Sequence, residues 1–210
     1  MTEPRRPQIS SRKQPQQARS AGLVAAILQA AVQVLAKEGA ARFTTARVAE
    51  KAGVSVGSVY QYFPNKAAIL FRLQADEWQQ TQGMLRSILS DASQPPLARL
   101  RTLVHAFIRS ECEEAGMRSA LSDAAPLYRD APEAQAMRAS ADGIIDAFMQ
   151  EVLPHAPANR RALAGAMVTD TMGALGSQFS ASPRTEAEMK AYADGMADMF
   201  CAYLQALQQG

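Results

Sequence analysis

The chain has 210 residues, 48% of them hydrophobic and 20% charged, which is typical of a globular protein with a sizeable core. It contains no uninterrupted stretch of about 20 apolar residues, which argues against a membrane-spanning segment, and its basic N-terminus lacks the pattern of a signal peptide. Two cysteines are too few for a disulfide scaffold, so we expect a reduced, cytoplasmic protein without a membrane partner.

Positive charge is concentrated near the N-terminus, although the net charge of the whole chain is only +2. Residues 1–66 hold ten Lys or Arg against three Asp or Glu, a net charge of +7. Residues 67–210 hold twelve basic against seventeen acidic residues, a net charge of −5. A segment of such charge predicts a polyanionic partner. A solubilising tail would explain the basic residues of 1–19 but not those further in, at positions 42, 47, 51 and 66.

The first predicted segments are an arm and a helix. Residues 1–19 combine Pro, Gln and basic residues with scarcely an apolar side chain, so we expect a disordered basic arm. Ser20 is a suitable N-cap for the helix that follows. Apolar residues recur at helical spacing from there to Gly39, which is a natural helix terminator.

Two short helices are predicted next. Thr44 or Thr45 caps the first of them, which ends at Gly53. Ser55 caps the second, which ends before a proline at position 64. Lys66 then begins a long fourth helix.

Prolines divide the rest of the chain into further helices, and we find no alternating strand pattern and no internal repeat. Helices are expected to begin at Pro96 and at Pro132, the latter running to about residue 152. A nearly uncharged helix is expected over about 159–179, and a final one over about 184–207. The predicted fold is therefore all-α.

The segment from Phe43 to Lys66 has the spacing of a helix-turn-helix. Its two short helices meet at a turn containing Gly53, which can adopt a backbone conformation that side chains resist. Ala49 is small enough to let the helices cross closely, and Val59 packs the second helix on the first. In such a motif the second helix lies in the major groove of DNA. The alternative, an ordinary helical bundle, does not account for the basic charge of the same segment.

The remaining face of the second helix supplies groups for reading DNA. Gln61 can pair with an adenine edge, Ser58 can serve several bases, and Val56 can contact a thymine methyl. Gly57 brings the backbone close to the DNA, and Tyr60 and Tyr62 complete the face. Phosphate contacts, which give affinity and register, are expected from four further residues, Thr44, Thr45, Arg47 and Lys66.

This segment resembles the DNA-binding domain of the tetracycline-repressor (TetR) family. The family pattern is Phe-Thr-Thr, two residues, an apolar-Ala pair, Ala-Gly-Val-Ser, Gly, an apolar-Tyr pair, Tyr-Phe and Lys, and positions 43–66 match all of it. The resemblance covers about residues 20–70 and implies DNA contacts within this segment, at Thr45, Arg47, Val56, Gly57, Ser58, Tyr60, Gln61, Tyr62 and Lys66. It also implies three parts, an arm (1–19), an N-terminal three-helix DNA-binding domain (20–66) and a C-terminal helical domain for ligand binding and dimerisation (67–210).

The second domain is rich in methionine, a residue whose flexible side chain suits apolar pockets. By resemblance, the helices that wrap the family's ligand cavity carry the candidate ligand-binding residues Phe107, Met117, Tyr128, Met137, Phe148, Met149 and Met167. Core and dimer packing is the favoured interpretation for the methionines at 189, 196 and 199. Asp170 is the only charged residue between Arg161 and Arg184, and it can be exposed, pair across a dimer or face a ligand.

No catalytic site, cofactor or metal centre is predicted. The two histidines, His105 and His155, form no constellation with a nucleophile, and no Gly-rich phosphate loop is present. His105 and Cys112 lie seven residues apart on one expected helix, about 10 Å along its axis, which is too far to share a metal. An enzyme is therefore not expected.

The sequence predicts a ligand-responsive transcriptional regulator, most simply a repressor, that binds a palindromic double-stranded DNA operator as a homodimer. A small hydrophobic or cationic effector is expected to release it. The last two helices are expected to form the dimer contact through Met196 and Phe200. The alternative is a DNA-binding regulator whose C-terminal domain only dimerises or binds a protein partner. A helical ligand carrier with an incidental basic segment is a third interpretation.

Overall fold

The computed structural model describes residues 8–11 and 18–209, and these residues form two compact units. Among the described residues, the first unit comprises positions 8–11, 18–79 and 116–138, and the second comprises 80–115 and 139–209. Every regular element in the described ranges is a helix, which confirms the predicted all-α class. The chain enters each unit twice, so neither unit is a continuous stretch of sequence.

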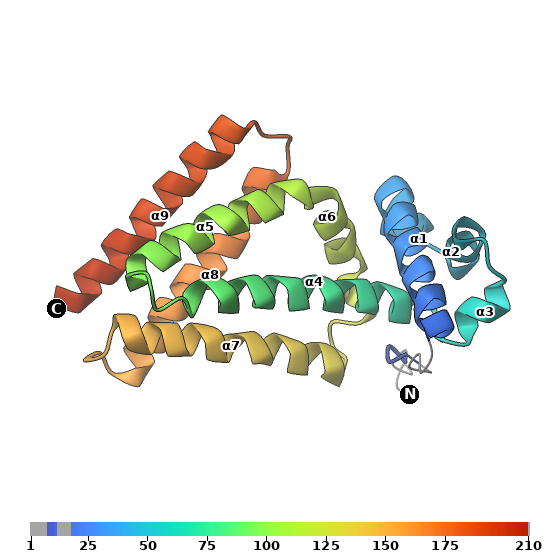
Figure 1. The fold of residues 1–210 in the computed structure, drawn as a ribbon, viewed down its shortest axis with the longest axis horizontal. Coiled ribbons are helices and arrows are strands. Elements are labelled where there is room, and N and C mark those ends of the chain that lie inside the picture. Colours follow the sequence, from blue (N-terminus) through green and yellow to red (C-terminus); the bar gives the residue numbers. More distant parts are fainter. Residues whose placement is uncertain (1–7, 12–17, 210) are drawn as a thin grey trace, which may run out of the picture. The chain divides into compact units, whose positions relative to one another are not determined.

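The first unit is built from six helical segments and a short 3-10 turn (Figure 1). In chain order they are α1 (Ala18–Arg42), α2 (Thr45–Ala52), α3 (Val56–Tyr60), the first part of α4 (Lys66–Leu89), α6 (Ala115–Ala124), the 3-10 turn η1 (Ala125–Leu127) and the beginning of α7 (Pro132–Val152). Their fully buried side chains include Ile27, Leu35, Phe43, Phe63, Leu70 and Leu121.

The expected boundary at residue 66 does not coincide with the edge of this unit. The first turns of α4 bury Ile69 and Leu70 in the same apolar cluster as α1. Leu121 and Ala124 of α6 belong to that cluster as well. Apolar side chains beyond residue 66 therefore complete the core of the unit that carries the helix-turn-helix.

Helix α1 differs in two ways from the sequence interpretation. It begins at Ala18, so Ser20 lies inside the helix and is not its N-cap. Gly39, predicted to end the helix, has a left-handed φ of 72° and kinks the chain there, after which one more helical turn runs to Arg42. The glycine interrupts the helix as expected, because this conformation costs glycine little.

By length and composition alone, α1 could cross a membrane between Ser20 and Arg42. No such stretch was expected from the sequence. Its side chains Ile27, Ala31 and Leu35 are completely buried in the first unit, and α1 packs on α2. A core helix of a soluble protein has the same composition, so the packing accounts for the apolar character of α1.

The second unit contains the end of α4, α5 (Pro96–Glu113), most of α7, α8 (Ala158–Ser180) and α9 (Glu186–Gln209). Helix α9 packs along α5, and α8 packs on both (Figure 1). Its fully buried side chains include Leu100, Leu103, Ile108, Met149, Leu153 and Leu204. The predicted starts at Pro96 and Pro132 match the observed helices.

Two glycines let α8 approach its neighbours closely. A Cβ atom at Gly176 would lie 2.8 Å from Cε1 of Phe107 on α5 and 3.2 Å from Cγ of Glu111. A Cβ atom at Gly165 would lie 2.9 Å from Cγ2 of Ile145 on α7. The spacing of α8 against α5 and α7 therefore depends on the absence of side chains at these two positions.

Candidate nucleic-acid interface

Local hydrogen bonds fix the turn between α2 and α3. The side chain of Thr44 accepts a hydrogen bond from the backbone N–H of Arg47, and thus Thr44 is the N-cap of α2. Gly53 ends the helix with φ 68° and ψ 31°, and its N–H donates to the carbonyls of Ala49 and Glu50. Ser55 caps α3 by accepting from the N–H of Ser58 over 3.0 Å. The sequence predicted these roles for Gly53 and Ser55, and Thr44 was one of its two candidates for the N-cap of α2.

One side of the motif is buried and holds α3 in place. Val48 and Val59 are completely buried and Ala49 nearly so, while Val54 is half-buried. Helix α2 packs on both α1 and α3. The short α3 is therefore held by apolar contacts with the helices around it and not by its own five residues, because isolated helices of that length are unstable.

The opposite side of α3 is open to solvent. Gly57 and Gln61 are exposed, and Val56 and Tyr60 are 39% and 43% exposed. Ser58 is half-buried, and its hydroxyl lies 2.8 Å from that of Ser55. A helix that exposes a valine, a tyrosine and a glutamine on one face offers both apolar and hydrogen-bonding groups to a base-pair edge.

Two residues with expected DNA contacts lie in the core. Thr45 is 7% exposed and Tyr62 is 6% exposed. Thr45 shares the inner face of α2 with Val48 and Ala49, and Tyr62 follows Val59 by three positions, which is one helical turn. Both side chains therefore lie in the interior of the first unit and not on the open face of α3.

The residues expected to contact phosphate differ in the interactions that their side chains make within the chain. Arg47 forms an ion pair with Glu38 of α1 and donates to the carbonyl of Arg42, so it also ties α2 to α1. Lys66, in contrast, is half-buried at the first position of α4, and Asn65 caps that helix by accepting from the N–H of Ala68. Donors at a helix N-terminus and a nearby lysine both attract phosphate.

Residues 8–11 of the expected disordered arm lie against the first unit. Ile9 is only 3% exposed and belongs to the apolar cluster of that unit. Asn65 donates to the carbonyl of Gln8 over 2.9 Å, and the hydroxyl of Ser10 donates to Glu133 over 2.9 Å. The prediction overlooked the one isolated isoleucine of the arm, whose apolar side chain is the signal for this contact. The rest of the arm, at 1–7 and 12–17, lies outside the described residues.

The candidate ligand-binding residues divide between the units. Phe107, Phe148 and Met149 are buried in the second unit, where they contribute to its core. Tyr128 and Met117 pack in the first unit, where Met137 also lies half-buried.

The last two candidates lie on the surface of α8. Met167 is 50% exposed, and Asp170 is exposed as well. Exposure was one of the three alternatives left open for Asp170. Neither side chain is therefore enclosed in the core of this single chain.

A buried polar network that was not expected from the sequence links α4 with α6 and with Tyr128, the residue after η1. Glu77 is 8% exposed and pairs with Arg118 over 3.0 Å. Gln74 donates to Glu77 over 2.9 Å and accepts from the hydroxyl of Tyr128 over 3.1 Å. The available signal was the position of Glu77, four residues after Leu73 on the apolar face of α4, where a charge requires a partner.

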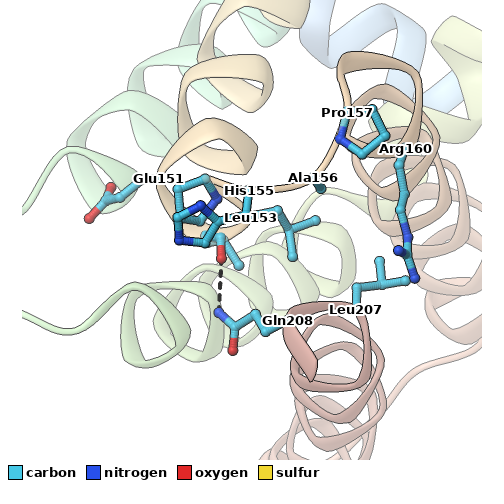
Figure 2. A pocket seen from close by; sticks show the side chains of 10 residues that line it. Glu151, Leu153, His155, Ala156, Pro157, Arg160, Leu207 and Gln208 are labelled. Carbon is cyan, nitrogen blue, oxygen red and sulfur yellow. Dashed lines mark hydrogen bonds between the residues drawn. The ribbon is translucent and has the colours of Figure 1, made fainter. Parts of the chain in front are cut away.

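The second unit also contains open cavities and two cysteines that form no disulfide. A cavity of about 500 Å³ lies beside the α7–α8 connection. Figure 2 shows His155 and Arg160 on opposite sides of it and Leu207 of α9 near Arg160. Both cysteines are free, and burial raises the pKa of the Cys112 and Cys201 thiols. The described residues contain no group of three or more His, Cys, Asp or Glu that could hold a metal ion.

Two family models match the chain, one for each part. Residues 27–73 match the model described as bacterial regulatory proteins, tetR family. Residues 95–207 match the model described as tetracyclin repressor-like, C-terminal domain. The first contains the helix-turn-helix, and the second covers α5 to α9 almost completely.

Solved structures have the same fold. The fatty acid degradation regulator FadR of Bacillus halodurans superposes with a TM-score of 0.65 at 18% identity, covering 89% of this chain and 96% of its own. NalD of Pseudomonas aeruginosa, the secondary repressor of the MexAB-OprM multidrug efflux pump, superposes with a TM-score of 0.63 at 19% identity, covering 88% and 96%. At these identities the likeness concerns the fold.

A curated relative matches part of the chain. The nucleoid occlusion factor SlmA of Vibrio campbellii is 32% identical over 105 residues, which are 50% of this chain and 53% of that protein. The chain thus spans about half the length of this relative.

Proposed function

This chain belongs to the TetR family of DNA-binding transcriptional regulators, and from this premise we propose that it is a cytoplasmic, effector-responsive repressor. It binds a palindromic operator as a homodimer and leaves the operator when a small apolar effector occupies the second unit. The open face of α3, with Val56 and Tyr60 exposed on a helix held from behind by Val59, carries the proposal. Large side chains exposed on so short a helix are available for a partner.

Reading and positioning are divided between different residues. Gln61 and Ser58 discriminate bases through hydrogen bonds, and Val56 contacts a thymine methyl. Lys66 and Thr44 position the unit through phosphates. Arg47 also reaches phosphate, but it must first leave or share its ion pair with Glu38. Thr45 and Tyr62 contact DNA only at their edges, since both are buried in the free chain.

The homodimer uses the exposed apolar side chains of α8 and α9. Leu163 and Met167 on α8 are 60% and 50% exposed, and Met199 on α9 is 46% exposed. Met196 and Phe200, at which the sequence placed the contact, are 5% and 3% exposed and already lie in the core of the second unit. The exposed Leu163, Met167 and Met199 support a dimer contact on the expected two helices, but not through Met196 and Phe200.

The effector acts through α4, which belongs to both units. A ligand shifts operator affinity only if it binds the DNA-bound and the released forms with different affinity. Residues 66–79 of α4 belong to the first unit and residues 80–89 to the second. In this proposal the helix transmits a change at its C-terminal end to the unit that carries α3. Of the candidate residues, Phe148 lies both in the core and at an open cavity of the second unit.

The similarity to SlmA supports a second candidate function. That relative is called a nucleoid occlusion factor, and it matches half of this chain at 32% identity. In this alternative the C-terminal domain dimerises or binds a protein partner, and no small molecule releases the DNA. Several chromosomal sites that retain their affinity in the presence of every candidate effector would favour it.

The proposed function is tested by binding fragments of the source genome to the purified full-length protein and sequencing the retained DNA. We expect a small number of retained fragments, all with the same palindrome, because each helix-turn-helix of a two-fold dimer binds one half-site. Retention of fragments without a shared motif would contradict sequence-specific regulation. A retained palindrome that no small molecule releases would leave the DNA-binding function intact and favour the second candidate.

A further inference from the structure

The second unit contains an open cavity of about 510 Å³ between the C-terminal end of α4, the beginning of α5 and the last turns of α7. Its walls combine two arginines and one glutamate with apolar and small side chains. The lining residues are Arg86, Leu89, Ser90, Ala92, Arg99, Ile144, Ala147, Phe148 and Glu151.

Arg99 is the unusual member of this lining, because a charged side chain is rarely so buried. It is only 4% exposed. Its Nη1 donates to the carbonyl of Leu89, the last residue of α4, and its Nη2 donates to Oε1 of Glu151 on α7. The guanidinium carbon also lies 5.8 Å from the centre of the Phe148 ring. One side chain thus joins α4, α5 and α7.

The hydrogen bonding of this guanidinium is incomplete. Its Nε is buried and has no hydrogen-bond partner among the described residues. A buried donor without a partner is costly. In a planar guanidinium, Nε–H and one N–H of the neighbouring Nη point in the same direction, so one carboxylate can accept from both. Glu151 accepts only from Nη2, and therefore half of a bidentate carboxylate position is unused.

A second cation is available at the same cavity. Arg86 is exposed and forms no ion pair with any described residue. The nearby carboxylate of Asp91 does not line the cavity and is engaged by Ser93, whose N–H and O–H donate to it over 3.1 and 2.6 Å. The lining therefore carries two positive charges against the single negative charge of Glu151, and Glu151 is 49% exposed and free to turn outward.

We propose that this cavity binds an amphiphile with a carboxylate head group. The head group takes the place of Glu151 at Arg99, accepts from both Nε and Nη2, and pairs with Arg86. The apolar part of the ligand lies on Leu89, Ile144 and Phe148. The inference rests on the proposed function in so far as it names the effector class, and it gives that effector the opposite charge to the cationic compound that the acidic net charge of residues 67–210 suggested.

Such a ligand would act on the end of α4. Arg99 holds the carbonyl of Leu89, which an α-helix leaves without an internal partner at its C-terminus. Exchange of Glu151 for a ligand carboxylate changes the position of Arg99 and with it the anchoring of α4. A role for Arg99 in anchoring alone would predict no ligand preference and no part for Arg86.

Titration calorimetry on the full-length protein without DNA tests the site. Decanoate, decanol and decylamine are matched probes, used below the concentration at which they form micelles. We expect decanoate to bind roughly tenfold more tightly than decanol, as charged hydrogen bonds allow, and decylamine to bind more weakly than either. Arg86→Gln should remove most of this preference. Because Arg86 is exposed, this variant keeps its fold, which thermal unfolding verifies, whereas substitutions of Arg99 risk misfolding.

Two further variants sharpen the test. Arg160→Gln removes an arginine from a different cavity of the second unit (Figure 2) and should leave decanoate affinity unchanged. Glu151→Gln removes the competing carboxylate and should strengthen decanoate binding severalfold. Equal affinities for the three probes, or equal losses in Arg86→Gln and Arg160→Gln, would overturn the proposal. Decanoate binding that leaves the operator complex intact would support the site and overturn its role in the proposed function.

Discussion

The helix-turn-helix depends on signals between neighbouring residues, whereas the packing of the C-terminal helices depends on contacts between residues far apart in the sequence. In α2 and α3, each structural feature has a local cause: Thr44 and Ser55 cap, and Gly53 takes the left-handed conformation at the turn. In the second unit, the fit of α8 against α5 depends on Gly176 meeting Phe107, sixty-nine positions away. A motif of local signals can be identified from one sequence, whereas a surface formed by distant side chains cannot.

The largest effect is expected from substitutions of two methionines on α9. Met199 is 46% exposed and Met196 is 5% exposed. We expect Met199→Glu to give a folded monomer whose operator affinity falls by about 100-fold or more, because the dimer holds its two half-sites together. Met196→Glu should instead yield unfolded or insoluble protein, since it buries a charge in the core. Sedimentation and thermal unfolding separate the two outcomes, and a dimeric Met199→Glu would refute the proposed contact.

The next effect compares two glycines on α8. Gly176→Ala should destabilise the protein by about 1–3 kcal/mol, because its Cβ atom would overlap Phe107. Gly173 has open space around its Cβ position, so Gly173→Ala should raise the free energy of unfolding by about 0.5–1 kcal/mol. Urea denaturation measures both values. Equal changes at the two positions would mean that α8 does not depend on this close contact with α5.

A third comparison concerns two residues proposed to contact DNA, Gln61 and Lys66. Gln61→Ala should relax the preference for particular bases at a cost of about 1–3 kcal/mol. Lys66→Ala should weaken binding to all sequences alike and reduce the slope of the salt dependence by about one unit. Binding to an operator library at several salt concentrations distinguishes them. Identical profiles for the two variants would disprove the division between reading and positioning residues.

The smallest effect concerns the N-terminal arm. Deleting residues 2–7 removes Arg5 and Arg6 and should reduce operator affinity severalfold at low salt, with an unchanged melting temperature. Ile9→Ala should instead lower the free energy of unfolding by about 2 kcal/mol, because Ile9 is buried in the first unit. If the deletion left operator affinity unchanged at every salt concentration, the arm would have no part in DNA binding.

The sequence allowed the prediction of much of the fold for identifiable reasons. Pro96 and Pro132 mark helix starts because proline suits the first turn and no other. Helix α6 was not predicted, since its buried residues are Ala120, Leu121 and Ala124, a pattern too short and too rich in alanine to stand out.

The candidate site was predictable only in part. The exposed face of α3 follows from helical periodicity, because Val59 must face inward. Periodicity also places Thr45 and Tyr62 on inner faces, and the expectation from the sequence that both contact DNA neglected this. The buried contacts of Ile9, Glu77 and Arg99 join segments far apart in the chain, and no local pattern reveals their partners.

The central claim is that the exposed face of α3 reads a specific DNA sequence. The most direct test is protection of a retained genomic fragment from hydroxyl radicals, comparing the wild-type protein with the variant Gln61→Ala. The account predicts two protected stretches of the DNA backbone related by two-fold symmetry, about one helical turn or a multiple of it apart, and weaker, less selective protection by the variant. Protection that is uniform along the fragment, or unchanged in Gln61→Ala, would contradict it.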